Sequence, residues 1–332
     1  MRTLKVLFVG VRFYDYLDYI VSALQRTCGS QVDVIVTNPE MNTVHKILYK
    51  CTNRNWYIEE TKHRQIIEFE NLNSCRYDVI FVLLGYWLYL PAFWEFIEVH
   101  RESYKVLYLW DSLINAKSND KVIYDSGNDF LSCFDDIYSF DRLDCERFDF
   151  SFLPLFYTDD YIYKQERKKI DFYCVSSLHS GRELLLKHIS KHARERKLNV
   201  YFKLFTGASN IIKNLFTGNI YSLQYIAYKG ISLKDNACLM KTSKITIDIP
   251  SPTQNGLSMR SIEALAAHTK LLTTNSDVVN YNFYHPNNIH VISWENPEIP
   301  DGFLESSYHS IDEEIVRSYS IDSWVKKILA RV

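Results

Sequence analysis

The chain has 332 residues, of which 47% are hydrophobic and 23% charged, a balance typical of a folded globular protein. This is more chain than one hydrophobic core usually serves, so two domains are expected. The formal net charge of −2 provides no extended positive field, which argues against a nucleic-acid partner and requires any anion site to be local.

Cysteine usage and the N-terminal residues indicate a reducing compartment. The seven cysteines are odd in number and scattered, and no C-x-x-C pair occurs, so neither a disulfide framework nor a zinc site is expected. The apolar run LKVLFVG near the N-terminus is too short for a signal peptide and predicts a first strand. We therefore expect a cytoplasmic protein.

The first half of the chain alternates strand and helix patterns, which predicts a doubly wound α/β sheet with right-handed crossovers. The expected strands are residues 4–10, 31–38, 79–84, 104–110 and a short edge strand at 135–141. The expected helices are residues 16–24, 41–49, 61–72 and 91–100.

The third of these strands opens an uncharged stretch, VIFVLLGYWLYLPAFW. It is shorter than the roughly 20 residues of a membrane-spanning helix, and Gly85 and Pro91 interrupt it. We interpret it as a buried strand, an aromatic loop and a helix that begins at Pro91. The loop residues Tyr86, Trp87 and Tyr89 either pack in the core or form a patch that contacts a membrane or an acceptor.

A stretch with Pro154, a run of charges and no clean period separates this half from a second one that follows the same logic. The expected strands there are residues 171–177, 199–207, 243–250, 270–275 and 288–293, with helices at 182–196 and 320–332. We therefore expect two Rossmann-like domains, residues 1–157 and 171–310, joined by a linker at 158–170 and followed by a helical segment at 311–332.

Ligands of open α/β sheets bind beyond the carboxyl ends of the strands, where loops enter helices. In the second domain this rule selects Arg182, Lys203 and the segment 254–263. Gly256 there leads into a helix start whose N–H groups suit a phosphate, and Arg182 and Arg260 can bind phosphate through charged hydrogen bonds.

Glu263, one turn into the same helix, can accept hydrogen bonds from the hydroxyls of a ribose. The apolar stripe of this helix is formed by Met259, Ile262, Leu265 and Ala266, so Arg260 and Glu263 are expected off the core-facing side. The alternative is that the two form an i,i+3 ion pair on a solvated face.

In the first domain the same rule selects Gly10 and Arg12 after the first strand, Tyr86 after the third and Asp111 after the fourth. A carboxylate at this edge can act as a general base, although an aspartate that only forms a turn or a helix cap fits equally well. Motifs for dinucleotide binding, the P-loop and the hydrolase elbow are absent. His188 and His192 lack the glutamate of a zinc motif, so no metal is expected.

The run EALAAHTKLLTTN resembles the nucleotide-sugar segment of GT-B glycosyltransferases, in which a glutamate heads a Glu-Ala-Leu/Met-Ala run before a strand. Together with LYLWDSL, DDIYSFDRLD, FLPLFY, IDIPSPTQNGLSMRSI and NFYHPNNIHVI, it resembles bacterial capsule, O-antigen and exopolysaccharide transferases of the CgeB-like kind. These segments lie between Leu107 and Ile292.

The resemblance implies a GT-B fold, in which the two domains face each other across a cleft and the C-terminal helix returns to the N-terminal domain. It implies that Glu263 binds the donor ribose. The donor diphosphate and sugar would lie at Arg182, Lys203, Gln254, Asn255, Gly256, Ser258 and Arg260. Asn255 stands where many retaining members have the first of two glutamates, so the stereochemistry stays open.

The expected function is transfer of a sugar from a nucleotide-sugar donor to a glycan or lipid-linked acceptor, in the cytoplasm or at the inner face of the plasma membrane. No cofactor and no metal are expected, because positive charge and a helix dipole can stabilise the leaving diphosphate. Asp111 would deprotonate the acceptor if the reaction inverts, with Gly10, Arg12 and Tyr86 beside it. The alternatives are a nucleotide-sugar epimerase or hydrolase, and a non-catalytic two-lobed sugar-binding protein.

Overall fold

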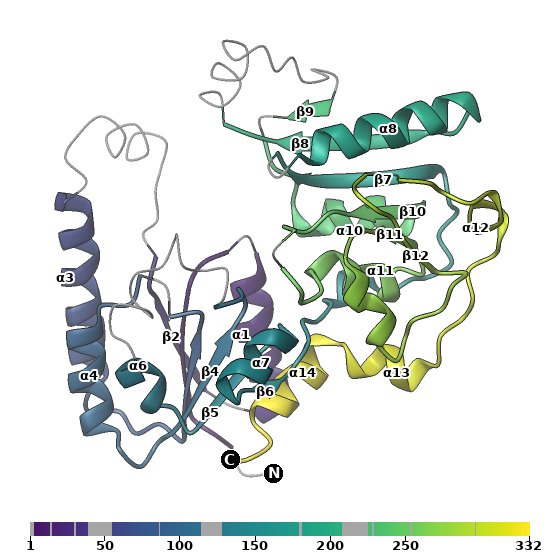
Figure 1. Cartoon of the computed structure of the whole chain (residues 1–332). Helices are drawn as coiled ribbons and strands as arrows, with labels where there is room; N and C mark the ends of the chain where they lie inside the picture. Colours follow the sequence, from purple (N-terminus) through teal and green to yellow (C-terminus); the bar gives the residue numbers. More distant parts are fainter. Residues whose placement is uncertain are drawn as a thin grey trace. The chain divides into compact units, whose positions relative to one another are not determined.

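The chain folds into two compact units in a computed structural model (Figure 1). Unit 1 comprises residues 1–153 and 321–332, and unit 2 comprises residues 154–320. The structure describes residues 3–13, 15–29, 31–38, 55–85, 87–113, 128–178, 181–207, 225–227, 229–252, 254–295 and 297–332. The helix predicted at 41–49, and Tyr86, lie outside these ranges.

Unit 1 is built on a parallel sheet in the order β2-β1-β3-β4-β5-β6. Its strands are β1 (Val6–Gly10), β2 (Val32–Val36), β3 (Val79–Leu83), β4 (Tyr104–Leu109), β5 (Asp136–Ser139) and β6 (Ser151–Phe152). Every residue of β1 and β3 is buried, because helices cover both faces of the sheet. The strand predicted at 135–141 is present as β5, but its predicted edge position is wrong, since β6 pairs with the outer side of β5.

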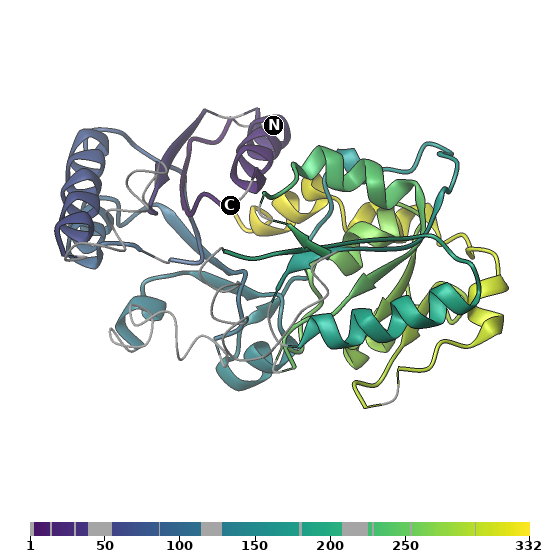
Figure 2. The same ribbon diagram turned by 90° about the horizontal axis from the view of Figure 1, so that it is seen from above.

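Two groups of helices cover this sheet (Figures 1 and 2). On one face lie α3 (Asn55–Leu72), α4 (Leu90–Val99) and α6 (Asn128–Ser132), whose phenylalanines join the strand residues in a single core. On the other lie α1 (Tyr16–Cys28) and α14 (Ile321–Ile328), while α7 (Arg142–Phe148) follows β5.

Helix α14 returns to unit 1 from the far end of the chain, as the resemblance implied. Trp324 is fully buried, with its ring 5.8 Å from that of Phe81 and 4.7 Å from that of Tyr108. Asp322 pairs with Arg26 of α1 at 2.8 Å. The last helix therefore forms part of the core of unit 1.

The parallel sheet of unit 2 has the order β12-β11-β10-β7-β8-β9. Its strands are β7 (Ile170–Ser177), β8 (Val200–Phe205), β9 (Ile226–Ala227), β10 (Ser243–Asp248), β11 (Lys270–Thr273) and β12 (Ile289–Val291). Counted from β7, this is the strand order of a Rossmann sheet. The direction of sheet growth reverses between β7 and β10, and ligands of such sheets bind at this topological switch point.

The helices of unit 2 are α8 (Arg182–Glu195), α10 (Leu233–Lys241), α11 (Met259–Ala266), α12 (Asp301–Glu305) and α13 (Glu313–Ser318), with 3-10 turns η2 (Asp159–Tyr161) and η4 (Ser276–Asn280). The teal helix α8 and the green helix α10 lie on opposite faces of the strands (Figure 2). In the described part of the chain, no helix has the length and apolarity needed to cross a membrane.

Candidate functional site

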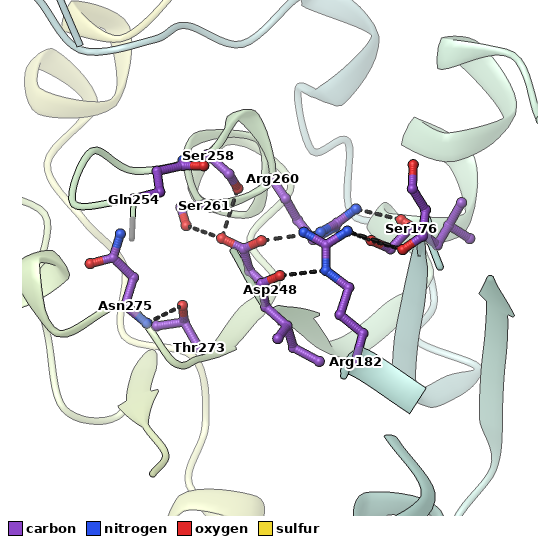
Figure 3. A network of polar contacts seen from close by, with 12 residues as sticks. Ser176, Arg182, Asp248, Gln254, Ser258, Arg260, Ser261, Thr273 and Asn275 are labelled. Atoms are coloured by element: carbon purple, nitrogen blue, oxygen red, sulfur yellow. Dashed lines mark hydrogen bonds and ion pairs between the residues drawn. The ribbon is translucent and has the colours of Figure 1, made fainter. Parts of the chain in front are cut away.

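A buried carboxylate organises the switch point of unit 2. Asp248 is the last residue of β10 and is 1% exposed. One of its oxygens, Oδ2, accepts hydrogen bonds from Ser258 Oγ at 2.7 Å and Ser261 Oγ at 3.0 Å. The other, Oδ1, lies 3.1 Å from Nη1 of Arg260 (Figure 3). Asp248 thus fixes the first turn of α11 to the carboxyl edge of the sheet.

Two arginines tie together the strands on either side of the switch point. Arg260 donates a second hydrogen bond, to the carbonyl of Val175 in β7. Arg182 donates from Nε to the carbonyl of Ile249 at 2.6 Å and from Nη1 to Ser176 Oγ at 2.6 Å (Figure 3). Both guanidinium groups therefore make bonds that span β7 and β10.

The electrostatics of this cluster favour an anion. Burial is the largest influence and disfavours the charged form of Arg260, but the Asp248 carboxylate and the other surrounding groups, Glu263 among them, together outweigh it and raise the pKa of Arg260. Burial lowers the pKa of Arg182, and the neighbouring charge of Arg260 lowers it further. Two guanidinium groups thus lie close together at the edge of the sheet, with the carboxylates of Asp248 and Glu263 acting on Arg260.

The loop that leads into α11 is fastened by side-chain amides. Gln254 Nε2 donates to the Gly256 carbonyl at 2.9 Å, and Asn275 Nδ2 donates to the carbonyls of Asn255 at 2.9 Å and Gly256 at 3.2 Å. Asn275 follows β11, so this strand also holds the loop (Figure 3). Ser258 is the N-cap residue of α11, but its hydroxyl bonds Asp248 and makes no cap to the helix backbone.

The expectation that Glu263 lies off the core-facing side of α11 is wrong, and so is the alternative of a solvated ion pair with Arg260. Residues 261–266 are all buried, and Glu263 is 3% exposed. The Glu263 carboxylate forms a hydrogen bond with the hydroxyl of Tyr161, which lies in η2. Arg260 forms its ion pair with Asp248. The i,i+3 ion pair considered for Arg260 and Glu263 is therefore replaced by two separate contacts to other elements.

Tyr161 continues this network into the neighbouring helix and strand. Its hydroxyl accepts a hydrogen bond from Asn236 Nδ2 of α10, and the oxygen of the same amide accepts from the hydroxyl of Tyr173 in β7. Burial first, and the Glu263 charge second, raise the pKa of Tyr161 far above its ordinary value. The Tyr161 hydroxyl therefore stays protonated and remains a hydrogen-bond donor to the Glu263 carboxylate.

Lys203 lies on β8, beside Val175 of β7 in the parallel register. Its side chain is half-buried, and within the described ranges no carboxylate forms an ion pair with it. Lys203 differs in this respect from Arg182 and Arg260, whose guanidinium groups are held by protein acceptors.

Gly10, Arg12 and Asp111, which were predicted for unit 1, lie at the carboxyl edge of its sheet, where β1 and β3 form the corresponding switch point. Gly10 ends β1, and an added Cβ there would lie 3.0 Å from Cζ of Phe8, which explains the glycine by packing alone. The Arg12 backbone N–H donates to Asn38 Oδ1 at 2.6 Å, and its side chain lies 3.4 Å from an Asp18 oxygen. Asp111 is exposed two residues after β4.

Sequence reasoning missed the residues that organise the site. Asp248 carried a signal, since it is the single carboxylate of its strand and ends that strand at a carboxyl edge. Ser261 and Asn275 had no comparable signal, because hydroxyls and amides are common in helices and turns. Among the described residues, no group of three or more His, Cys, Asp or Glu side chains is placed to hold a metal ion.

No protein-family model matches the chain, and no curated protein matches its sequence. Solved structures match its fold at low sequence identity. UDP-GlcNAc 2-epimerase from Neisseria meningitidis bound to UDP-GlcNAc matches with a TM-score of 0.53 and 11% identity, over 99% of this chain and 99% of that one. S. aureus MnaA in its co-structure with UDP gives a TM-score of 0.51 and 12% identity, over 98% of this chain and 95% of that one.

The catalytic domain of starch synthase IV from Arabidopsis thaliana, bound to ADP and acarbose, matches with a TM-score of 0.50 and 9% identity, over 99% of this chain and 96% of that one. The chain covers 59% of a chain in the GtfA/B complex, with a TM-score of 0.46 and 12% identity. The two matches with TM-scores above 0.5 and the two parallel sheets show that the chain has an α/β, two-domain, GT-B-like fold.

Proposed function

We propose that the protein is a glycosyltransferase that takes a sugar from a nucleotide-sugar donor bound in unit 2. The observation that carries this proposal is the polar network at the switch point of the unit 2 sheet, where Arg182, Arg260 and the start of α11 converge on one edge. A diphosphate suits this edge, because a helix start and neighbouring guanidinium groups both favour an anion.

The contacts suggest different roles for the three cations. The guanidinium groups of Arg182 and Arg260 already bond to protein acceptors, so we assign them as fixed positive charges. Lys203 makes no such ion pair in the described part of the chain, so it is the cation that we expect to contact the diphosphate. Fixed charges that need not move during reaction stabilise a leaving group efficiently.

We assign the acceptor to unit 1, with Asp111 as the base if the reaction inverts. Asp111 is exposed and lies two residues after β4, at the carboxyl edge of the sheet, where ligands of such sheets bind. The resemblance to capsule and O-antigen transferases supports a glycan or lipid-linked acceptor in surface polysaccharide biosynthesis, with the enzyme at the inner face of the membrane. We propose a metal-independent reaction, in which the charges of unit 2 act in place of a cation.

A UDP-GlcNAc 2-epimerase activity is the second candidate. Structures that carry this name match nearly the whole of this chain and of their own, with TM-scores of 0.53 and 0.54. An epimerase would use the same nucleotide-sugar site in unit 2 but would need no acceptor.

Two measurements test these proposals. Isothermal titration with UDP, GDP, dTDP and CMP is expected to reveal binding of one nucleotide, and Lys203→Ala is expected to weaken it. Binding of none of the four would overturn the donor site.

The sugar form of the nucleotide that binds is then incubated with the protein and followed by proton NMR. A changed sugar without any acceptor identifies the epimerase. Release of nucleoside diphosphate that requires an added glycan acceptor identifies the transferase.

A further inference from the structure

Helix α8 turns a basic face away from the sheet of unit 2. The apolar residues of its other face are buried in the hydrophobic core. The outer face carries Lys187, Lys191 and Arg194, which are exposed and follow one another at intervals of one helical turn. Lys197, just after the helix, is exposed as well. Four cations are thus spread over about 15 Å of this surface.

The charge of this face is not neutralised by ion pairs. In the described part of the chain, none of the four cations forms an ion pair with a carboxylate. The exposed helix α3 of unit 1 differs, because its Lys62 pairs with Glu59 at 2.8 Å. One acidic residue, Glu195, follows Arg194 on α8, so the face keeps a positive balance. Such a face attracts a surface of negative charge.

An apolar side chain begins the same face. Leu184 lies three residues before Lys187, and at 69% exposure it is the most exposed large hydrophobic side chain among the residues that the structure describes. A row of cations beside an exposed leucine is typical of a helix that lies in the interface of a membrane, where head groups meet acyl chains.

The combination favours a lipid surface over a nucleic acid. A nucleic acid would be held by the cations alone, and the net charge of −2 gives the chain no wider positive field to attract one. Anionic lipids bind helices that carry clusters of about four to eight Lys or Arg residues, and the layer beneath their head groups also accepts a leucine.

We propose that the outer face of α8, formed by Leu184, Lys187, Lys191, Arg194 and Lys197, binds an anionic lipid surface. The helix lies along the head groups, and the Leu184 side chain enters the boundary with the acyl chains. Leu184 is two residues after Arg182 of the switch-point network, so this contact brings the donor edge of unit 2 close to the lipid. The proposal rests on the proposed function in one respect, since that function places the enzyme at a membrane.

The test is sedimentation of the full chain with vesicles of phosphatidylcholine alone or mixed with phosphatidylglycerol. We expect binding only to the anionic vesicles, and weaker binding as the salt concentration rises. The double variant Lys187→Glu/Lys191→Glu is expected to weaken binding at least about 25-fold, because loss of each lysine near an anionic surface costs about fivefold. Lys187→Gln/Lys191→Gln is expected to have a smaller effect.

The matched control is Lys326→Glu/Lys327→Glu on α14, which changes the net charge equally at two other exposed lysines. It should bind the vesicles as the parent protein does, and circular dichroism checks that each variant is folded. Leu184→Ser is expected to weaken vesicle binding about threefold or more. Binding that is the same in Leu184→Ser and the parent protein would overturn the choice of a lipid over other polyanions.

Equal losses in the α8 and α14 double variants overturn the proposed face, as does unchanged binding in both. Titration with UDP, GDP, dTDP and CMP on the same proteins separates this result from the proposed function. A protein that binds a nucleotide but no vesicle overturns the lipid-binding face and leaves the donor site in place. Vesicle binding that depends on Lys187 and Lys191 in a protein that binds no nucleotide supports this face and overturns the proposed function instead.

Discussion

At the scale of single residues, Asp248 decides how the start of α11 is held. Its buried carboxylate accepts hydrogen bonds from two serine hydroxyls and forms an ion pair with Arg260. Loss of the carboxylate therefore leaves Arg260 without this ion pair. Breaking a buried pair by removal of one partner costs about 3–5 kcal/mol.

We therefore expect Asp248→Asn to lower the free energy of unfolding of unit 2 by several kcal/mol, measured by urea denaturation. Asp301→Asn is the control, because Asp301 is 66% exposed and pairs with Arg196. Its loss is expected to cost no more than about 1 kcal/mol. Equal effects of the two substitutions would contradict the role given to Asp248.

Glu263 is a residue for which the resemblance and the structure suggest different roles. The resemblance assigns its carboxylate to the donor ribose, whereas the structure has it bonded to the Tyr161 hydroxyl. The ribose role requires Tyr161 to give up this bond when a nucleotide binds.

The variants Glu263→Gln and Tyr161→Phe separate these roles. If the carboxylate binds ribose, Glu263→Gln weakens nucleotide binding by about 1–3 kcal/mol, the range for a charged hydrogen bond. Tyr161→Phe, which keeps the carboxylate, is then expected to leave affinity unchanged or to raise it, as titration calorimetry would show. Loss of stability alone in both variants would make Glu263 a purely structural residue.

At the scale of elements, the sequence predicted whether each segment is a helix or a strand better than it predicted what that element packs against. The continuous apolar runs of β1, β3 and β4 predicted buried parallel strands, because such strands are covered on both faces. The turn and the helical period predicted helix α11, but they did not predict that the side of the helix carrying Glu263 is buried. That side is closed by η2, through the Tyr161 contact to Glu263, and no local pattern records a contact across a hundred residues. Strand order was likewise beyond reach, since the pairing of β7 with β10 is a long-range contact.

Lys270 joins the start of β11 to the end of α12. Its titration makes the free energy of unfolding depend on pH. Its ammonium donates to the carbonyls of Phe303 and Ser306 and to the Ser306 hydroxyl at 2.9 Å, and burial lowers the pKa of Lys270 to about 8. The unfolded chain keeps the ordinary lysine pKa of about 10.4. Between these values the unfolded state binds more protons, so the free energy of unfolding rises with pH.

We expect Lys270→Met to flatten that rise between pH 8 and about 9.5, in urea denaturation followed at several pH values. Burial also lowers the pKa of Lys168 to about 8, so part of the slope is expected to remain. Lys187→Met, on the exposed side of α8, is the control and should leave the slope as it is. A slope in Lys270→Met equal to that of the parent protein would contradict the prediction.

At the scale of the whole molecule, each unit has its own sheet and its own hydrophobic core, and the chain enters unit 1 twice. Alternating strands and helices predicted two Rossmann-like domains, and the amphipathic pattern at 320–332 predicted the last helix. The amphipathic pattern of that helix does not indicate the surface on which it packs. Its return to unit 1 was implied by the resemblance alone.

This arrangement allows the two units to be perturbed separately. Trp324 belongs to the core of unit 1, so Trp324→Ala is expected to destabilise that unit by about 3–5 kcal/mol through the cavity it leaves. A nucleotide that binds unit 2 stabilises that unit by about 2.7 kcal/mol at a hundred times its Kd. In scanning calorimetry we therefore expect Trp324→Ala to lower one transition and the bound nucleotide to raise the other. Trp87→Ala, at a side chain 41% exposed, is the control for unit 1 and should shift neither by much. A nucleotide that raises only the transition lowered by Trp324→Ala would move the donor site to unit 1 and reverse the assignment of the two domains.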